Sequence, residues 1–401
     1  MASLNEQERD FIRRHLDSDL KALALAAHRY KGITVSTLIP RIAALRKLRE
    51  KAPSLFRLDL EIPSLLSVEQ ASSEVVARFK TSLFSGKHLL DLTGGLGIDA
   101  YFWSKRFEEV TYVEREPLLS QAARHNFARL SATNIQVITA EAEDFLKKSS
   151  QTFDLIYLDP DRRNPSQRRL FRLEDCSPNV IALHKLLLSH APKMLIKASP
   201  MLDLTQAQQR LPQIEHIWVE SWKGEVREVL LLAGHSSVNA DEVPIEATIL
   251  SGESVQTFQF TRAEEHSCLP QLSEPLRYLY EPDPSILKAG AFKVFAKRFG
   301  LSKLHLHAHL YTADALELNL PAKIFAVEAV FKYDRKVARQ FLPERRANVV
   351  VRHFPDSPDQ VRQRLGLAEG GDKYLFATTA KDGRKILILC IRLDSSSRKM
   401  A

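Results

Sequence analysis

Residues 89–100 read Leu89-Leu90-Asp91-Leu92-Thr93-Gly94-Gly95-Leu96-Gly97-Ile98-Asp99-Ala100, and this stretch decides the fold of the chain. An apolar run that ends in an acid is followed by three glycines within four residues and then by a helical pattern, which predicts a strand that turns sharply into a helix. Glycines at such a turn permit positive φ angles and let backbone N–H groups approach a bound group closely. The stretch therefore predicts a nucleotide-like cofactor at the carboxyl end of the first strand of an open α/β sheet.

The spacing of the glycines and the acid before them narrow the class of ligand. A dinucleotide-binding loop spaces its glycines G-x-G-x-x-G, so that a pyrophosphate meets a helix N-terminus, whereas residues 94–97 read G-G-x-G. The chain also has no G-x-x-x-x-G-K-[ST] sequence to supply the lysine that a triphosphate needs. Asp91, at the end of the strand, suits a ligand with a cationic amino group.

The composition indicates a protein of several domains. With 401 residues and 44% hydrophobic content, the chain can bury a core in two or three domains. It has no apolar run long enough to span a bilayer and no signal-peptide pattern at its N-terminus, so we expect a cytoplasmic protein. Cys176, Cys268 and Cys390 lie far apart, which excludes a disulfide framework and a CxxC metal or redox motif, and no metal is expected.

The net charge of +8 is concentrated at the C-terminal end. Residues 322–401 contain 17 Lys and Arg against 9 Asp and Glu, and residues 1–321 contain 40 of each kind. A neutral body with a basic C-terminal part favours a polyanionic partner, most simply nucleic acid. The alternative is a basic face that only makes the protein soluble.

The region before the glycine stretch has helical patterns. Residues 1–60 predict a helical cap in which Pro40 begins a second helix that ends at Pro53. A further helix is predicted from Ser67, as its N-cap, to about Phe84. Its polar beginning, residues 69–73, either covers the cofactor pocket or complements the positive end of the helix dipole.

From Lys87 to Ala233, short apolar runs alternate with helical patterns. This alternation predicts a doubly wound, mostly parallel sheet. The last two strands are joined by only five residues, 222–226, which is too short for a crossover helix and predicts an antiparallel pair. The predicted strands are 88–92, 109–114, 135–139, 153–158, 193–198, 216–221 and 227–233, and the predicted helices are 98–107, 117–130, 142–148, 177–190 and 203–211.

The pattern changes after Gly234. Residues 247–250 and 255–261 predict a hairpin, and Pro284 is expected to begin a helix whose apolar face runs from Ile286 to Phe299. Residues 322–394 predict an α+β module with strands 324–331, 347–352, 373–379 and 385–391 and helices 334–341 and 358–365. The polar tail 395–401 is expected to be disordered.

Several strand ends carry acids that fit an adenosine-containing cofactor. The pattern D-x-T-G-G-L-G-x-D over residues 91–99 resembles motif I of class I methyltransferases, whose ligand is S-adenosyl-L-methionine. Glu114, at the end of the second strand, can accept hydrogen bonds from both ribose hydroxyls. Glu141, after the third strand, lies where this class reads the adenine amine, although an acid at a helix start also complements the helix dipole. The predicted cofactor-binding residues are Asp91, Thr93, Gly94, Gly95, Gly97, Glu114 and Glu141.

The fourth strand ends in Asp159-Pro160-Asp161-Arg162-Arg163, where class I enzymes that methylate nucleic-acid amines carry D/N-P-P-Y/F. The Asp159 carboxylate and the Pro160 carbonyl are predicted to align an amine lone pair with the methyl group, so proximity supplies most of the rate. The aromatic residue that stacks on the base in those enzymes is missing, since Asp161 and Arg162 stand in its place. Arginines that suit a phosphate backbone follow, and the predicted substrate-binding residues are Arg162, Arg163, Arg168 and Arg169. The alternative is a solvated loop paired with Glu174 and Asp175.

Two further groups of residues have a chemical and a structural interpretation. Cys176 precedes a predicted helix start, which lowers a thiol pKa and permits a covalent mechanism, but a buried packing role is favoured. His305, His307 and His309 alternate like one face of a strand, and a polar strand face is favoured over a metal site because no acid or cysteine accompanies them.

Residues 69–234 resemble a bacterial group of class I methyltransferase-like proteins with a THUMP-like C-terminal part. The resemblance lies in residues 69–73, 91–99, 112–114, 159–163, 176–179 and 196–203, and farther along the chain in 286–290 and 346–390. The group reads Asp-Pro-Ala-Arg-Arg where this chain has Asp161 third. THUMP domains proper bind RNA, usually tRNA, so the resemblance implies an RNA substrate.

The resemblance implies a Rossmann-like α/β sheet, mostly parallel with an antiparallel last strand, between a helical cap and C-terminal α+β domains. The expected domains are a cap (1–66), a methyltransferase domain (67–235), a ferredoxin-like domain (236–321), a THUMP-like domain (322–394) and the tail (395–401). The favoured function is methyl transfer from S-adenosyl-L-methionine to a nucleobase of tRNA or rRNA. A protein or small-molecule methyltransferase and a non-catalytic RNA-binding protein are the alternatives.

Overall fold

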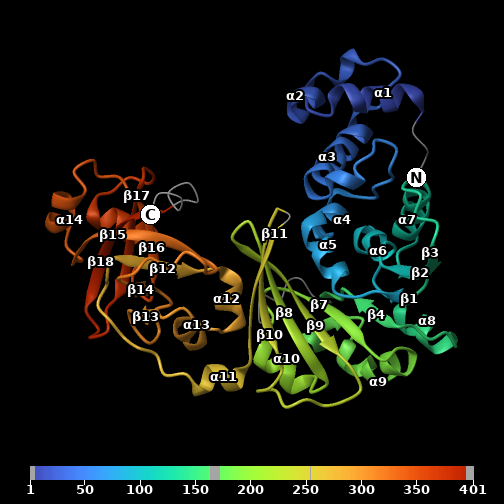
Figure 1. Ribbon diagram of the computed structural model, residues 1–401. Helices are drawn as coiled ribbons and strands as arrows, with labels where there is room; N and C mark the ends of the chain where they lie inside the picture. Colours follow the sequence, from blue (N-terminus) through green and yellow to red (C-terminus); the bar gives the residue numbers. More distant parts are fainter. Residues whose placement is uncertain (1–4, 163–171, 253, 394–401) are drawn as a thin grey trace. The chain divides into compact units, whose positions relative to one another are not determined.

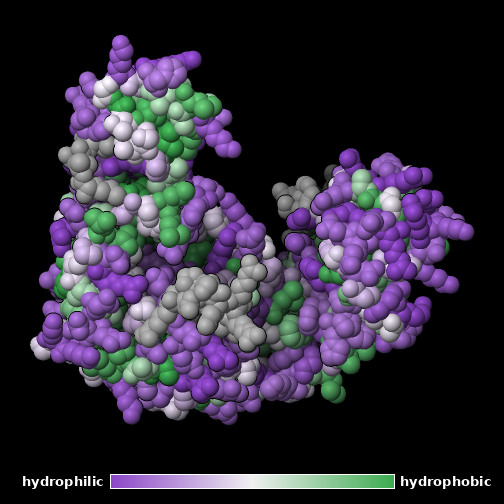
Figure 2. All heavy atoms as spheres, turned by 180° about the vertical axis from the view of Figure 1, so that it is seen from behind, coloured by the Kyte–Doolittle hydropathy of each residue, from purple (hydrophilic) through white to green (hydrophobic). Residues whose placement is uncertain are grey.

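The computed structural model describes residues 5–162, 172–252 and 254–393, and the chain divides into two compact units (Figure 1). Unit 1 comprises residues 1–217 and 227–240, and unit 2 comprises residues 218–226 and 241–401. Hydrophilic side chains cover most of the face in Figure 2, whereas buried apolar side chains form separate clusters within each unit. Over the described ranges, no helix is both long and apolar enough to cross a membrane.

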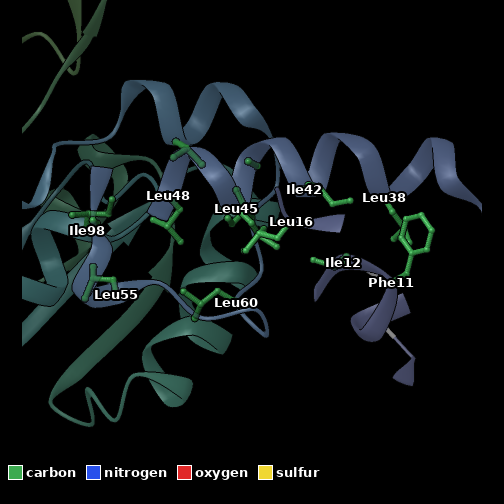
Figure 3. Close-up of a cluster of buried hydrophobic side chains, with 14 of the residues drawn as sticks. Phe11, Ile12, Leu16, Leu38, Ile42, Leu45, Leu48, Leu55, Leu60 and Ile98 are labelled. Atoms are coloured by element: carbon green, nitrogen blue, oxygen red, sulfur yellow. The ribbon is translucent and has the colours of Figure 1, made fainter. Parts of the chain in front are cut away.

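Unit 1 begins with three α-helices, α1 (Glu6–His15), α2 (Leu20–Leu25) and α3 (Val35–Lys51), and two short 3-10 turns, Ala27–Arg29 and Pro53–Leu55. Their apolar faces pack on one another, with Phe11, Ile12, Leu38, Ile42 and Leu45 in the buried cluster of Figure 3. The predicted helix start at Pro40 is wrong, because Pro40 lies inside α3. Burial of Val35 and Leu38 extends the helix before the proline, which removes only one backbone hydrogen bond.

The single helix predicted from Ser67 to Phe84 is also wrong. The structure has α4 (Leu65–Gln70), capped by the Ser64 side chain, and α5 (Glu74–Ser82), with extended backbone between them. At the break, the Ser72 hydroxyl donates to the Asp99 carboxylate over 2.9 Å. The break therefore positions a side chain that a continuous helix would place elsewhere.

The sheet of unit 1 is mostly parallel, as predicted (Figure 1). Six neighbouring strands of this nine-stranded sheet, in the order β9-β7-β4-β1-β2-β3, are β1 (Gly86–Asp91), β2 (Phe107–Glu114), β3 (Ile135–Thr139), β4 (Leu155–Leu158), β7 (Met194–Ala198) and β9 (Glu225–Ala233). Parallel ladders join β3, β2, β1, β4 and β7, whereas β9 is antiparallel to β7. The predicted antiparallel last strand is confirmed.

Helices alternate with these strands along the chain: α6 (Ile98–Trp103), α7 (Pro117–Arg129), α8 (Ala142–Lys148), α9 (Val180–His190) and α10 (Leu204–Arg210). Strand β8 (Ile214–Trp222) precedes β9 and neighbours it in the sheet. Two short strands, β5 (Asp161–Arg162) and β6 (Cys176–Ser177), form an antiparallel pair, and a 3-10 turn spans Leu173–Asp175. These pieces follow β4 and bring residues 161 and 177 together.

Unit 2 contains the predicted hairpin, β10 (Ile245–Ser251) and β11 (Ser254–Phe260), whose strands follow β8 at one edge of the nine-stranded sheet, and a second sheet. The second sheet runs in the order β13-β14-β12-β15-β18-β17-β16. Its strands are β12 (Tyr278–Pro282), β13 (Ser302–Lys303), β14 (Tyr311–Ala313), β15 (Ala322–Lys332), β16 (Asn348–Arg352), β17 (Lys373–Thr379) and β18 (Lys385–Arg392). Because β12 pairs with β15, the predicted boundary at residue 321 does not interrupt this sheet.

The helices of unit 2 are α11 (Arg262–Ser267), α12 (Pro284–Ala289), α13 (Lys293–Arg298), α14 (Arg335–Phe341) and α15 (Pro358–Leu365). The helix predicted to continue from Pro284 is two helices, since Gly290 ends α12 with a φ of 88°. The predicted strand at His305–His309 is absent from this described region, and the chain bends there instead. His305 stacks on His353 with ring centroids 4.6 Å apart, and His309 stacks on Phe292 at 3.9 Å.

Candidate functional site

A pocket of about 370 Å³ lies in unit 1 at the carboxyl ends of β1, β2 and β4. All seven residues predicted to bind the cofactor line it, as does Asp159. Among the described lining residues, nine are acids and only Arg115 is basic. The acids are Asp91, Asp99, Glu114, Glu116, Glu141, Glu143, Asp144, Asp159 and Asp161. Such a lining favours a ligand that carries positive charge and opposes one that carries phosphates.

The glycine loop follows β1 and packs tightly on the residues beneath it. A Cβ atom at Gly94 would lie 2.1 Å from the Tyr112 ring, and one at Gly97 would lie 2.7 Å from the Phe127 ring. Gly97 also adopts a φ of 86° as the N-cap of α6. The turn therefore requires glycine at both positions. Gly94 is required by close packing, and Gly97 by close packing and by its backbone conformation.

Glu114, at the end of β2, holds the loop in place. Its carboxylate accepts hydrogen bonds from the backbone N–H groups of Gly95 and Glu116, both over 2.8 Å. The Tyr112 hydroxyl donates to the Gly95 carbonyl over 2.6 Å, so Gly95 is fixed from both sides. Because a carboxylate offers about four lone-pair positions, Glu114 keeps acceptor capacity toward the pocket.

Asp91 ends β1 and is 1% exposed. Burial raises its pKa well above the ordinary aspartate value, and the neighbouring carboxylates of Asp99, Asp159 and Glu114 raise it further. Its carboxylate accepts one hydrogen bond, from the backbone N–H of Thr93 over 3.1 Å. A cationic group in the pocket would favour the ionised form of this carboxyl group.

Asp159 follows β4 and is held from two sides. Its backbone N–H donates to the Thr93 hydroxyl over 2.6 Å, which ties the end of β4 to the glycine loop. Its carboxylate forms an ion pair with the Nζ of Lys197, which lies in β7. Burial alone would lower the pKa of Lys197, but the carboxylates of Asp159 and Glu228 outweigh it and raise that pKa.

A buried network adjoins Asp99 beneath the pocket. Lys80 in α5 has no exposed side-chain surface, and its Nζ lies 3.0 Å from Asp99 and 3.1 Å from Glu228. It also donates to the Ser72 and Tyr157 hydroxyl oxygens over 3.2 and 3.0 Å. Burial alone would lower the pKa of Lys80 and raise that of Asp99, but their attraction reverses both directions.

Residues 67–72, which run from α4 into the break before α5, border the pocket. Ser67, Gln70, Ala71 and Ser72 line it, which agrees with the first of the two interpretations of residues 69–73 for Gln70, Ala71 and Ser72. Lys51, the last residue of α3, donates to the Ala71 carbonyl over 2.6 Å and also to the Glu69 carbonyl. Burial lowers the pKa of Lys51 to about 8. The N-terminal helices therefore hold one edge of the pocket.

The lysines of the site were missed by sequence reasoning. A weak signal was available: Lys197 interrupts the apolar run of β7, and Lys80 lies one helical turn after the buried residues Val76 and Ala77. Neither position identifies its partners, because Asp99, Glu228 and Asp159 are distant from both lysines in sequence.

The other predicted site residues have different outcomes. Glu141 lines the pocket as the N-cap residue of α8, so both of its proposed roles remain open. Pro160 is not among the lining residues, and Arg162 belongs to β5. Arg163, Arg168 and Arg169 lie outside the described residues. Cys176 is fully buried, and its thiol donates to the Arg172 carbonyl over 3.4 Å, which agrees with the packing role.

Three family models match successive parts of the chain. The model of conserved hypothetical protein 95 matches residues 63–175, a ferredoxin-like domain model matches 278–321, and a THUMP domain-like model matches 322–392. The first of these contains the glycine loop, Glu114 and Asp159. The strand order and the loop define a class I methyltransferase fold.

A crystal structure of a proposed methyltransferase from Porphyromonas gingivalis W83 resembles the whole chain, with a TM-score of 0.87 and 33% identity over 98% of this chain and 100% of that one. The chain belongs to the family of that protein, a group of class I methyltransferase-like proteins with a THUMP-like C-terminal domain.

Curated relatives match only the methyltransferase part. Ribosomal RNA small subunit methyltransferase J of Acinetobacter baumannii (strain SDF) is 31% identical over 140 residues, which are 32% of this chain and 50% of that protein. The protein of the same name from Coxiella burnetii (strain RSA 331 / Henzerling II) is 28% identical over 112 residues, 24% of this chain and 44% of that protein. The chain thus spans about half the length of these relatives.

Proposed function

We propose that this protein is an S-adenosyl-L-methionine-dependent methyltransferase that acts on a nucleobase of structured RNA, either tRNA or rRNA. The observation that carries the proposal is the acid-lined pocket, in which a buried aspartate of raised pKa faces the space beside the glycine loop. S-adenosyl-L-methionine carries a sulfonium and an ammonium group, so its charge is opposite to that of the lining. A dinucleotide or a triphosphate would meet repulsion there.

The residues of the pocket fit the parts of this cofactor. Asp91 would pair with the amino group, Glu114 would accept from the ribose hydroxyls, and Glu141 would accept from the adenine amine. The backbone at Gly94, Gly95 and Gly97 would border the cofactor, and the missing side chains at Gly94 and Gly97 let this loop pack closely on Tyr112 and Phe127. When bound, the cofactor supplies an activated methyl group.

The acceptor would lie at Asp159. The Asp159 carboxylate and the Pro160 carbonyl would accept the hydrogens of an amine and so orient its lone pair. Lys197 fixes the Asp159 carboxylate through a charge-assisted hydrogen bond, and the Thr93 hydroxyl fixes its backbone. These residues therefore position the acceptor, and proximity supplies most of the rate.

The RNA part of the proposal is supported by the names of the relatives, by the THUMP domain-like match and by the charge of residues 322–401. Arg162, Arg163, Arg168 and Arg169 are proposed to contact the phosphate backbone near the acceptor. A cytoplasmic location belongs to the same proposal, because the substrate is made there.

The test is methyl transfer from tritiated S-adenosyl-L-methionine to total RNA of a strain that lacks the gene. We expect label in RNA of the deletion strain and little in wild-type RNA, which is already modified. The control is Asp91→Ala, which should lose cofactor binding in calorimetry. Labelling of protein or small molecules without RNA would refute the RNA substrate, and absence of cofactor binding by the unaltered protein would refute the enzyme class.

A further inference from the structure

Seven of the 15 Lys and Arg side chains in residues 322–393 form ion pairs with acids that the structure describes. Glu281 pairs with both Lys323 and Arg352. Three further basic residues pair with acids of their own unit: Arg364 with Asp356, Lys373 with Glu328, and Arg384 with Asp382. These cations are partly neutralised, so the excess charge of the region lies elsewhere.

The unpaired charge is concentrated in residues 332–346, which hold six Lys and Arg against two acids, a net charge of +4. The six basic side chains are exposed, and within the described part of the chain none pairs with a carboxylate. We call this surface the α14 basic face; it consists of Lys332, Arg335, Lys336, Arg339, Arg345 and Arg346. Figure 1 shows α14 at the surface of unit 2.

Packing restricts the position of several of these side chains. The Arg335 guanidinium lies against Gly366, where a Cβ atom would come within 2.8 Å of it. The Arg346 side chain lies against Gly371, with 3.3 Å to the corresponding position. Arg345 has a φ of 52°, and its backbone is held by hydrogen bonds to Leu342 and Ala368. Since Arg335 and Arg346 pack against neighbouring backbone and the Arg345 backbone is hydrogen-bonded, binding costs these residues less conformational entropy than it would cost fully mobile side chains.

The α14 basic face also carries an exposed aromatic ring. Phe341, the last residue of α14, is 43% exposed, and its ring stacks on that of Phe331 with centroids 4.6 Å apart and planes 8° apart. Phe331 is itself nearly buried and supports the ring from one side. An aromatic ring among unpaired cations is the arrangement that single-stranded nucleic acids bind, because bases stack on the ring while phosphates pair with the cations.

We propose that the α14 basic face binds the phosphate backbone of an RNA loop and that Phe341 stacks on one of its unpaired bases. Four of the six cations are arginines, whose fork of N–H donors matches phosphate oxygens. An anionic lipid surface is the weaker alternative, since the visible face of unit 2 is predominantly hydrophilic (Figure 2). The proposal rests on the proposed function, because it assigns the surface that binds the RNA substrate.

The experiment measures binding of the full-length protein to total tRNA and to a ribosomal RNA fragment as a function of salt. Each phosphate contact contributes about 0.7–0.9 to the slope of log Kobs against log[salt]. The triple variant K332Q/K336Q/R339Q should therefore reduce the slope by about 2 and weaken binding at least tenfold at low salt. The matched control R364Q/K373Q/R384Q removes the same charge from paired residues and should change the slope by less than about 1.

A second variant tests the aromatic contact separately. Phe341→Ala should weaken RNA binding roughly 5- to 150-fold, the range for one stacked base, and leave the salt slope unchanged. Binding of S-adenosyl-L-methionine and the melting temperature show whether each variant is folded.

The outcomes separate this assignment from the proposed function. Equal slopes for the two triple variants would overturn the α14 basic face while leaving RNA as the substrate. Salt-independent or absent RNA binding by the unaltered protein, with cofactor binding intact, would overturn both the surface and the RNA substrate. Loss of binding to anionic lipid vesicles in the first triple variant, with RNA binding unaffected, would assign the face to a membrane instead.

Discussion

Replacing Lys80 with methionine should destabilise unit 1 strongly, because two carboxylates would remain buried without their cation. The Lys80 side chain is fully buried, and the exposures of the Asp99 and Glu228 side chains are 11% and 3%. Breaking a buried ion pair from one side costs about 3–5 kcal/mol. For a unit of this size, a loss of that magnitude lowers the melting temperature by roughly 6–20 °C.

The pH dependence of this loss distinguishes charge from packing. Burial already raises the pKa of Glu228 in the folded protein. Without Lys80 the pKa values of Glu228 and Asp99 should both rise, so the folded state takes up protons as the pH falls. The variant should therefore regain stability between pH 8 and pH 5, relative to the unaltered protein. The double variant K80M/E228Q has one buried charge fewer at every pH. Its loss of unfolding free energy should therefore be at least about 1 kcal/mol smaller than that of Lys80→Met alone.

Urea denaturation at pH 5, 6.5 and 8, followed by tryptophan fluorescence, measures these differences. The control is Lys47→Met, which breaks the exposed Lys47–Glu50 pair of 2.8 Å and should change stability by less than about 0.5 kcal/mol. The buried network would be refuted as a source of stability if Lys80→Met lowered the free energy of unfolding no more than the control does, or by an amount that does not vary with pH.

Three further predictions concern the pocket. Cofactor affinity should increase from pH 5 to pH 8, because burial raises the pKa of Asp91 and only its ionised form pairs with the ligand's amino group. Calorimetry should show proton release on cofactor binding, and Asp91→Asn should abolish the pH dependence of the affinity. Gly94→Ala should lower cofactor affinity more than tenfold, since its Cβ atom would overlap the Tyr112 ring, and equilibrium dialysis would measure the loss. Lys197→Met should reduce kcat of methyl transfer about 100-fold, because Asp159 loses its positioning partner, while cofactor affinity changes little and Lys197→Arg restores part of the rate.

The sequence predicted the parts of the molecule that local patterns determine. The glycines after β1 and the acids at the strand ends identified the pocket, because the parallel topology brings the carboxyl ends of strands to one edge. Continuous helices were predicted where the structure breaks them near Ser72 and at Gly290. Helical periodicity shows neither a tertiary hydrogen bond, such as that of Ser72 to Asp99, nor a left-handed backbone conformation, such as that of Gly290.

The buried lysines could not be predicted, because their role depends on contacts between residues distant in sequence. Lys80 reaches Tyr157 and Glu228 from another element, and a lone lysine in an apolar pattern is ordinarily exposed. A charged residue at a buried position predicts a partner of opposite charge, but periodicity does not say which one.

The distribution of these cations explains why the pocket suits a positively charged ligand. Asp99 is compensated by Lys80 and Asp159 by Lys197, so the protein itself supplies counter-ions for two of its buried or half-buried acids. Asp91 is as deeply buried, yet no ion pair to it occurs among the described residues, and burial together with three neighbouring acids raises its pKa. Among the acids that line the pocket, Asp91 is thus the deeply buried one to which the described residues supply no cation. We therefore expect the amino group of S-adenosyl-L-methionine to be the counter-ion of Asp91, and cofactor binding should stabilise unit 1 most at the pH values where Asp91 is ionised.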